Sequence, residues 1–207
     1  MQPITIDAIH LHPIALELAE KLRTSYGAEP FKSAVIIEMM TSDGATGWGE
    51  APTKMKPSYT YETMGTALHV LHEFLIPRLL GKTIASATEI PDLLKAVRGH
   101  PVAKFALEAA AWDALAKTND LPLADLFAAH LPPGNTPKGY ATVGVSIGIQ
   151  DSIAATLDVI AKRVAQGYGR VKLKIEPGWD VELARAVRQA YPDLVLMLDA
   201  NSAYTLA

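Results

Sequence analysis

The sequence contains no cysteine among its 207 residues. This absence excludes a disulfide framework, a thiol nucleophile and a zinc site built from thiolates. No apolar run approaches the ~20 residues that a membrane-spanning helix needs, and the N-terminus lacks the basic-then-apolar order of a secretory signal. The formal net charge of −3 gives no general attraction to nucleic acid or to anionic membranes. We therefore expect a cytoplasmic protein whose partners are neither nucleic acid nor membrane.

Apolar residues make up 49% of the chain, which is enough for a packed core. Alternating apolar residues predict strands at 4–12 and 33–40. Residues 42–44 have turn chemistry and predict a hairpin that leads to a strand at 46–51. Helical periodicity follows, and the predicted helices cover residues 61–77, 88–98, 101–115 and 123–129. Strands followed by a run of helices indicate an α+β domain, which we place at residues 1–131.

The helix that begins at Pro101 has its proline in the first turn, where the missing N–H costs nothing. Four of its apolar residues recur at helical spacing, and we expect them to form a buried stripe. They are Phe105, Ala109, Trp112 and Leu115. Proline and glycine at 132–137 then indicate a boundary between domains.

Beyond residue 137 the elements alternate between strand and helix. The predicted strands are 140–147, 170–175 and 194–198, and the predicted helices are 153–164 and 181–191. This order indicates a parallel sheet, and the last strand is apolar on both faces, so we expect it to be buried. The predicted fold is a capping domain followed, at 138–207, by the first units of an incomplete (β/α) barrel. Three strands cannot close a barrel, so we expect the chain to be the N-terminal part of a longer one.

Lys172 and Lys174 alternate with apolar residues on one predicted strand, so both side chains project from the same face. One interpretation is a solvent-exposed face, where lysine is common. The other is the interior of a barrel, where an unpaired ammonium costs several kcal/mol and two require carboxylates, a metal or an anionic ligand. Neighbouring positive charges also disfavour each other, so one of the two amines can be neutral and accept a proton from carbon.

Asp199 and Asn201 follow the next predicted strand, at the end where barrel enzymes carry their chemistry. A carboxylate there suits a hard cation such as Mg²⁺. The alternative is an ordinary capping or turn acid. One carboxylate does not make a metal site, so we expect two further ligands to come from outside residues 1–207.

These motifs in combination resemble the enolase superfamily, in the branch that contains o-succinylbenzoate synthase and N-acylamino acid (N-succinylamino acid) racemase. The likeness covers essentially the whole chain. The segments that carry it are Lys172-Leu173-Lys174, Pro177-Gly178-Trp179-Asp180, Asp199-Ala200-Asn201-Ser202-Ala203-Tyr204, Gly47-Trp48-Gly49-Glu50 and residues 23–27, 99–100, 103–108 and 144–149.

The resemblance implies a role for each matching residue. Lys174 would be the acid/base that abstracts the proton α to a carboxylate, and Lys172 would lie against that carboxylate. Asp199 would be the first of three ligands to Mg²⁺ or another divalent cation such as Mn²⁺. Asn201 and Ser146 would line the substrate pocket.

The resemblance also implies that two loops close over the variable end of the substrate. Leu22 belongs to the first, at 22–26, and Tyr59 to the second, at 54–59. Lys54 departs from the apolar residue expected there, which leaves the side-chain preference open.

The implied reaction is Mg²⁺-dependent removal of a proton from a small-molecule carboxylate through an ene-diolate. That intermediate can be dehydrated to o-succinylbenzoate, in menaquinone biosynthesis, or reprotonated on the opposite face, which is racemisation. We expect residues 1–207 alone to be inactive and the full-length protein to be a homo-oligomer. Two alternatives stay open: a Schiff-base aldolase that uses Lys174, and a non-catalytic fragment that associates with a separate C-terminal half.

Overall fold

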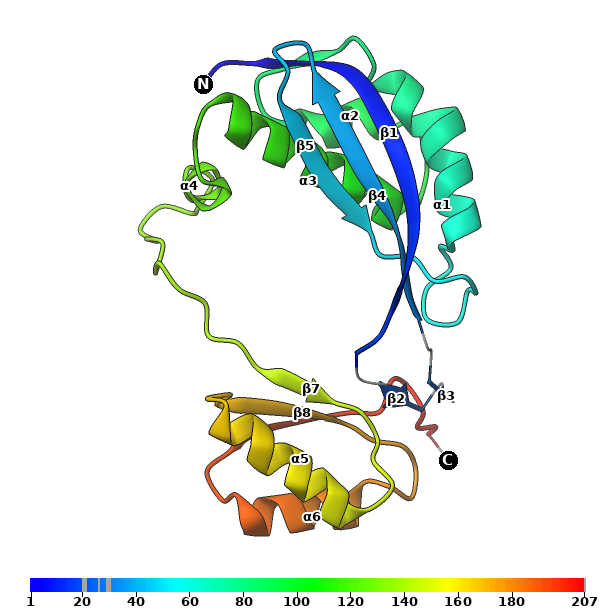
Figure 1. Ribbon diagram of the computed structural model, residues 1–207, viewed down its shortest axis with the longest axis vertical. Helices are drawn as coiled ribbons and strands as arrows, with labels where there is room; N and C mark the ends of the chain where they lie inside the picture. The colour runs from blue at the N-terminus through cyan, green and yellow to red at the C-terminus, as the bar shows by residue number, and fades with distance from the viewer. Residues whose placement is uncertain (20–21, 26, 29–30, 207) are drawn as a thin grey trace. The chain divides into compact units, whose positions relative to one another are not determined.

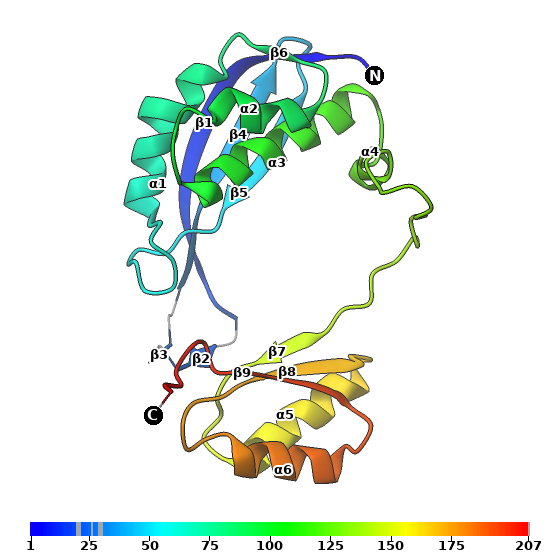
Figure 2. The same ribbon diagram turned by 180° about the vertical axis from the view of Figure 1, so that it is seen from behind.

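The computed structural model describes residues 1–19, 22–25, 27–28 and 31–206 (Figures 1 and 2). Within these residues the chain forms two compact units. The first comprises Met1–Glu17 and Phe31–Pro137, and the second comprises Leu18–Pro30 and Lys138–Ala207. The segment Leu18–Pro30, which lies inside the predicted domain 1–131, thus groups with the second unit. The domain boundaries themselves stay a prediction.

The first unit is built on an antiparallel sheet of four strands in the order β5-β4-β1-β6. The strands are β1 (Ile4–Glu17), β4 (Phe31–Thr41), β5 (Thr46–Ala51) and β6 (Thr83–Ile84). The β4–β5 hairpin is confirmed, and the predicted first strand extends five residues further, to Glu17, where it pairs with Phe31. Long pairing with β4 over a twisted ribbon explains why β1 continues past the point where its sequence stops alternating.

Helices cover one face of this sheet, as both ribbon views show. They are α1 (Met64–Val70), which continues as a π-turn (Leu71–Leu75) and a 3₁₀ turn (Ile76–Arg78), then a 3₁₀ turn (Ala87–Glu89), α2 (Ile90–Leu94) and α3 (Pro101–Thr118). The short α4 (Leu123–Ala128) follows α3 and packs against it, with the rings of Trp112 and Phe127 in contact. All four predicted helices are present, with the second much shorter than 88–98. Strands followed by helices confirm the α+β class of this unit.

Helix α3 packs closely on β5 because β5 carries glycine where the helix backbone approaches. A Cβ at Gly47 would lie 2.0 Å from Ala110 O, and one at Gly49 would lie 2.0 Å from Ala106 O. Ala106, Ala110 and Ala114 of α3 lie at this contact and are fully buried. The prediction that Phe105 belongs to the buried stripe is wrong, since its side chain is 61% exposed. Small residues, rather than the largest apolar ones, form the contact.

The second unit contains a parallel sheet in the order β7-β8-β9, with α5 and α6 on one face (Figure 1). Its elements are β7 (Val145–Ile147), α5 (Ile153–Ala165), β8 (Arg170–Lys174), α6 (Val181–Ala190), β9 (Val195–Asp199) and a short hairpin, β2 (Arg23–Thr24) with β3 (Gly27–Ala28). The alternating order and the parallel sheet are confirmed. The predicted strand 140–147 is reduced to its last three residues, and Tyr140 is exposed.

The core of this unit lies between the sheet and its two helices. Val171, Leu173 and Ile175 of the β8 region pack there with Ile160 of α5 and Val187 of α6. The prediction that β9 is buried is wrong. Among the described residues, β9 is an edge strand that pairs with β8 alone. Its Val195, Met197 and Leu198 are exposed. No helix in the described part of the chain has the length and hydropathy to cross a membrane.

Candidate active site

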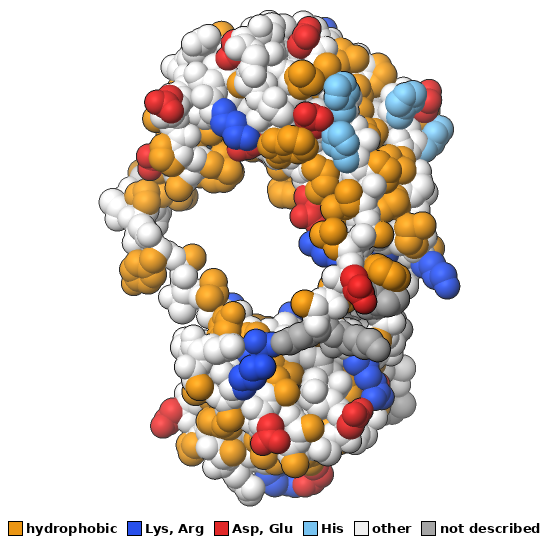
Figure 3. Space-filling view, in the orientation of Figure 1, with side chains coloured by type: hydrophobic (Ala, Val, Ile, Leu, Met, Phe, Trp, Pro, Cys, Tyr) orange, Lys and Arg blue, Asp and Glu red, His pale blue; other side chains and the backbone are white. Residues whose placement is uncertain are grey.

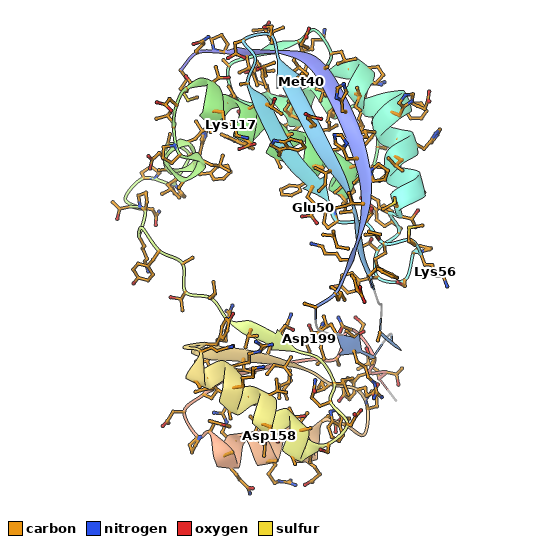
Figure 4. All side chains as sticks on the ribbon, viewed as in Figure 1. Met40, Glu50, Lys56, Lys117, Asp158 and Asp199 are labelled. Carbon is orange, nitrogen blue, oxygen red and sulfur yellow. The ribbon has the colours of Figure 1, made fainter. Side chains whose placement is uncertain are left out.

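The two lysines of β8 project from the face of the sheet opposite α5 and α6, which we term the lysine face. Val171 and Leu173 fill the helix-covered face, so strict alternation sends Lys172 and Lys174 the other way. Parallel register places Lys172 between Ser146 and Met197 and places Lys174 beside Asp199. Asp199 lies on the side of the sheet away from the helices (Figure 4).

Lys174 is buried although it is charged, with 8% of its surface exposed. Its Nζ donates to Asp199 Oδ2 at 2.9 Å and to Asn201 Oδ1 at 2.7 Å. The less buried Lys172 also reaches Asp199 Oδ2, at 3.3 Å. Two amines therefore meet at one carboxylate oxygen, which supplies the compensation that a buried ammonium requires. The interpretation of Lys174 as a solvent-facing lysine does not hold.

The carboxyl group of Asp199 is a stronger acid here than an ordinary aspartate. The hydrogen bond from Lys174, the backbone N–H of Asn201 at 3.0 Å and the Lys172 amine lower the pKa of the Asp199 carboxyl to about 2. The carboxylate is therefore ionised at neutral pH, as a ligand to a hard cation must be.

The turn after β9 fixes the neighbouring amide. Asn201 and Ser202 have φ of 50° and 62°, in the left-handed region, which costs a non-glycine residue about 1 kcal/mol or more. This turn directs the Asn201 side chain back onto Lys174. The carboxylate, the amide and the amine are thus held as one cluster by β8, β9 and the turn.

The donor set fits one ligand of a Mg²⁺ site and no more. Asp199 offers an ionised oxygen ligand of the type Mg²⁺ prefers. The described residues contain no cluster of three acidic or histidine side chains that could hold a metal. Any further ligands would have to come from elsewhere.

Two of the predicted substrate residues meet in the second unit. Ser146 and Leu22 line the same cavity of about 550 Å³, beside Gly148 and Lys162. Ser146 also lines a cavity of about 230 Å³ on the lysine face, together with Lys172. Ser146 thus lines both the Leu22 cavity and the cavity that Lys172 lines.

The other predicted loop belongs to the first unit. Tyr59 is 65% exposed, and the amine of Lys54 lies 5.8 Å from the centre of its ring. Tyr26, at the end of the predicted loop 22–26, lies outside the described residues.

A polar cluster on the first unit has no counterpart in the sequence patterns. Figure 3 shows histidine side chains gathered over β1 and over α1 on one face of that unit. His10 and His12 of β1 lie 3.5 Å and 2.8 Å from the Glu38 carboxylate on β4. The hydrogen bond from His12 is the main cause that lowers the pKa of the Glu38 carboxyl. Only the strand register, which pairs His10 with Glu38, reveals this contact.

The sequence also did not reveal the role of Ser25. Its hydroxyl donates to Ala200 O at 2.9 Å, directly beside Asp199. The motif at residues 23–27 marked the segment as notable, but a bond between residues 175 positions apart has no local pattern that could predict it.

Two family models match the chain. The first, described as the mandelate racemase / muconate lactonizing enzyme N-terminal domain, matches residues 8–128. The second, described as enolase C-terminal domain-like, matches residues 155–207. The second match contains the lysine strand and Asp199.

Curated relatives resemble the chain over nearly its whole length. An o-succinylbenzoate synthase of Geobacillus kaustophilus is 44% identical over 99% of this chain and 52% of the relative. An N-succinylamino acid racemase of an Amycolatopsis species is 39% identical over 97% of this chain and 53% of the relative. The chain spans about half the length of the curated relatives it matches.

Solved structures agree with the fold. The crystal structure of an enolase superfamily member from Listeria innocua has a TM-score of 0.87 and 38% identity, and covers 98% of this chain and 53% of that one. The crystal structure of the N-succinyl Arg/Lys racemase from Bacillus cereus has a TM-score of 0.83 and 27% identity, and covers 96% of this chain and 53% of that one. The α+β unit, the parallel β/α units and these matches together show that the chain belongs to the mandelate racemase / muconate lactonizing enzyme family of the enolase superfamily.

Proposed function

We propose that this chain contributes to an active site that removes the proton α to a carboxylate, in an o-succinylbenzoate synthase, an N-succinylamino acid racemase or an enzyme with both activities. The observation that carries the proposal is the meeting of Lys172 and Lys174 at one oxygen of Asp199, on the open face of a parallel sheet. The names of the relatives support both activities and do not separate them.

Removal of a proton from a weakly acidic C–H beside a carboxylate requires positive charge near the substrate. Loss of the α-proton leaves a dianionic ene-diolate, which ammonium groups stabilise as it forms. In our proposal Lys174 Nζ takes the proton, while the ammonium of Lys172 faces the substrate carboxylate. Asn201 and Ser146 orient the substrate. Lys174 must first exchange its contact with Asp199 for one with substrate, since an ammonium held by a carboxylate is a poor base.

Asp199 would hold Mg²⁺ in the active enzyme, and the cation would add positive charge beside the developing anion. Dehydration needs no further base, whereas racemisation needs a second acid/base on the opposite face of the substrate. We propose that this group and the remaining metal ligands come from outside residues 1–207, so that the chain alone is inactive.

We further propose that residues 1–131 form a capping domain whose loop with Tyr59, like the loop with Leu22, sets substrate preference. The synthase activity would place the protein in menaquinone biosynthesis in the cytoplasm. We propose a homo-oligomer for the full-length enzyme. Light scattering of that enzyme tests its assembly.

The test is a chimera in which residues 1–207 precede the C-terminal part of the Geobacillus kaustophilus synthase. We expect the chimera to form o-succinylbenzoate or to racemise an N-succinylamino acid, and EDTA to abolish the activity. Residues 1–207 alone should show no turnover. A folded chimera without either activity, or activity that persists in EDTA, would contradict the proposal.

The Schiff-base alternative predicts a different result. Borohydride would then trap a carbonyl substrate covalently on Lys174. The family assignment favours the metal-dependent reaction, and we expect no such adduct.

A further inference from the structure

The hairpin segment around Arg23 is attached to the strand ends of the second unit. The backbone N–H of Ile149, just after β7, donates to Arg23 O at 2.9 Å. The guanidinium of Arg23 lies 3.5 Å from the carboxylate of Glu176, just after β8. A segment far away in the sequence is thus fixed at two neighbouring strand ends.

Gly148 allows this segment to approach the sheet. A Cβ at Gly148 would lie 2.9 Å from Arg23 N, closer than real Cβ atoms approach, and 3.0 Å from Arg23 O, which is also tight. The backbone there is not in the left-handed region, so the close approach is what requires glycine. Any larger residue would push the Arg23 segment away from the strand ends.

The turn at residues 199–203 carries strain that its own hydrogen bonds must offset. Asn201 and Ser202 both have positive φ. Within the turn, Asn201 N donates to Asp199 Oδ1, and Ala203 N donates to Ala200 O at 3.1 Å. The conformation of this turn determines whether the Asn201 side chain reaches Lys174.

Ser25 adds a hydrogen bond from outside the turn. Its Oγ donates to Ala200 O at 2.9 Å, and the two groups are part-buried. Ala200 lies between Asp199 and Asn201 in the sequence, so this bond acts on the turn that carries both residues. The same carbonyl accepts the bond from Ala203, so Ser25 completes its pair of donors.

We infer that Ser25 is a positioning residue, which holds the 199–203 turn in the conformation that keeps Asp199 and Asn201 against Lys174. Arg23, through its contacts with Ile149 and Glu176, holds Ser25 in place. The consequence for catalysis rests on the proposed function, whereas the hydrogen bond and its effect on the turn do not.

The test is amide hydrogen exchange, measured by NMR on the 207-residue chain. In Ser25→Ala we expect the Ala203 amide to exchange about fivefold faster, as befits loss of one hydrogen bond of ordinary strength. The side-chain amide signal of Asn201 should shift as well. Ser25→Thr keeps the hydroxyl and should restore slow exchange. Gly148→Ala displaces the whole segment and should accelerate exchange at Ala203 without touching Ser25.

The matched control is Ser33→Ala, the same substitution in the first unit. Ser33 Oγ donates to the backbone Thr53 O at 2.7 Å, so its loss should leave Ala203 and Asn201 unchanged. Unchanged exchange at Ala203 in Ser25→Ala would overturn the inference. So would an equal acceleration across β8, which would indicate general loosening rather than positioning. Neither result depends on whether the enzyme activity proves correct.

Discussion

The two units place their apolar residues and their chemistry differently. In the first, Ile4, Ile6, Val35, Ile37 and Met39 of the sheet are at most 1% exposed. In the second, Val195, Met197 and Leu198 of β9 are exposed, while Lys174 is buried and forms an ion pair with Asp199. The first sheet is stabilised by apolar burial, and the lysine face by charge pairing. Substitutions should therefore have different energetic signatures in the two units.

The largest effect should follow from Gly49→Ala in the first unit. The new methyl group would lie 2.0 Å from Ala106 O, so α3 must move off β5. We expect a loss of more than about 3 kcal/mol, at or above the upper end of overpacking costs. Urea unfolding followed by circular dichroism measures it. The control, Gly65→Ala, has only Thr63 Oγ1 nearby, at 4.0 Å, and should not destabilise. Equal stability of both variants would refute the close packing.

The second effect concerns Glu62, a buried carboxylate that accepts the N–H groups of Val102 at 2.8 Å and Ala103 at 3.2 Å. Glu62→Ala should cost about 3 kcal/mol, because it leaves buried donors at the start of α3 without a partner. Glu89 is the matched control. It accepts two backbone N–H groups in the same way but is exposed, so Glu89→Ala should cost about 1 kcal/mol. If both cost the same, burial does not matter here.

The third effect is charge-dependent and belongs to the second unit. The folded-state pKa of Asp199, about 2, is below its ordinary value of 3.8. A carboxyl group whose pKa is lower in the folded state than in the unfolded state stabilises the fold at pH values above the unfolded-state pKa. This contribution is lost as the pH falls through the folded-state pKa. Asp199→Asn should therefore cost about 2 kcal/mol at pH 7 and progressively less as pH falls from 4 towards 2. A difference that does not vary with pH would show that the pairing contributes nothing.

The smallest effect should come from the edge strand. Val195→Ala on β9 removes a side chain that is 59% exposed, and we expect a change below about 0.5 kcal/mol. The comparison is Val35→Ala on β4, where the same atoms are fully buried, and the cost should be about 2–3 kcal/mol. Thermal unfolding measures both. A large cost at Val195 would mean that β9 is covered in solution.

Much of the fold could be predicted because its signals are local. The alternation around Lys172 and Lys174 predicts β8 and also the face that each lysine occupies. The turn at 42–44 predicts the β4–β5 hairpin, and helix-capping residues such as Asp180 mark where α6 begins. The position of Asp199 one helix further on predicts its nearness to Lys174, because parallel strands place their ends together.

The errors have a common physical cause, which is that burial depends on what packs against an element. Phe105 has the spacing of a buried residue, but α3 packs through alanine onto the glycines of β5 and leaves Phe105 exposed. The apolar residues of β9 suggested a covered strand, yet among the described residues β9 pairs with β8 alone. The spacing of apolar residues shows which face of a helix or strand is apolar, but not which element packs against that face.

The bonds that no pattern could predict join distant residues. Ser25 reaches Ala200, and Glu62 reaches the start of α3 40 residues later. Both hydrogen bonds depend on the tertiary structure alone. The first holds the turn after β9, and the second holds the first turn of α3.

The most direct test of the central claim compares Lys174→Ala with Lys138→Ala in the chimera described above, by following α-proton exchange of an N-succinylamino acid in D₂O by NMR. If Lys174 Nζ carries the proton, its loss should slow exchange by at least about 10³-fold for the enantiomer whose α-proton faces Lys174, even where an acid/base on the opposite face still exchanges the other enantiomer. The exposed Lys138 should not matter for either enantiomer. Exchange of both enantiomers by Lys174→Ala within a few-fold of the unsubstituted chimera would contradict the account.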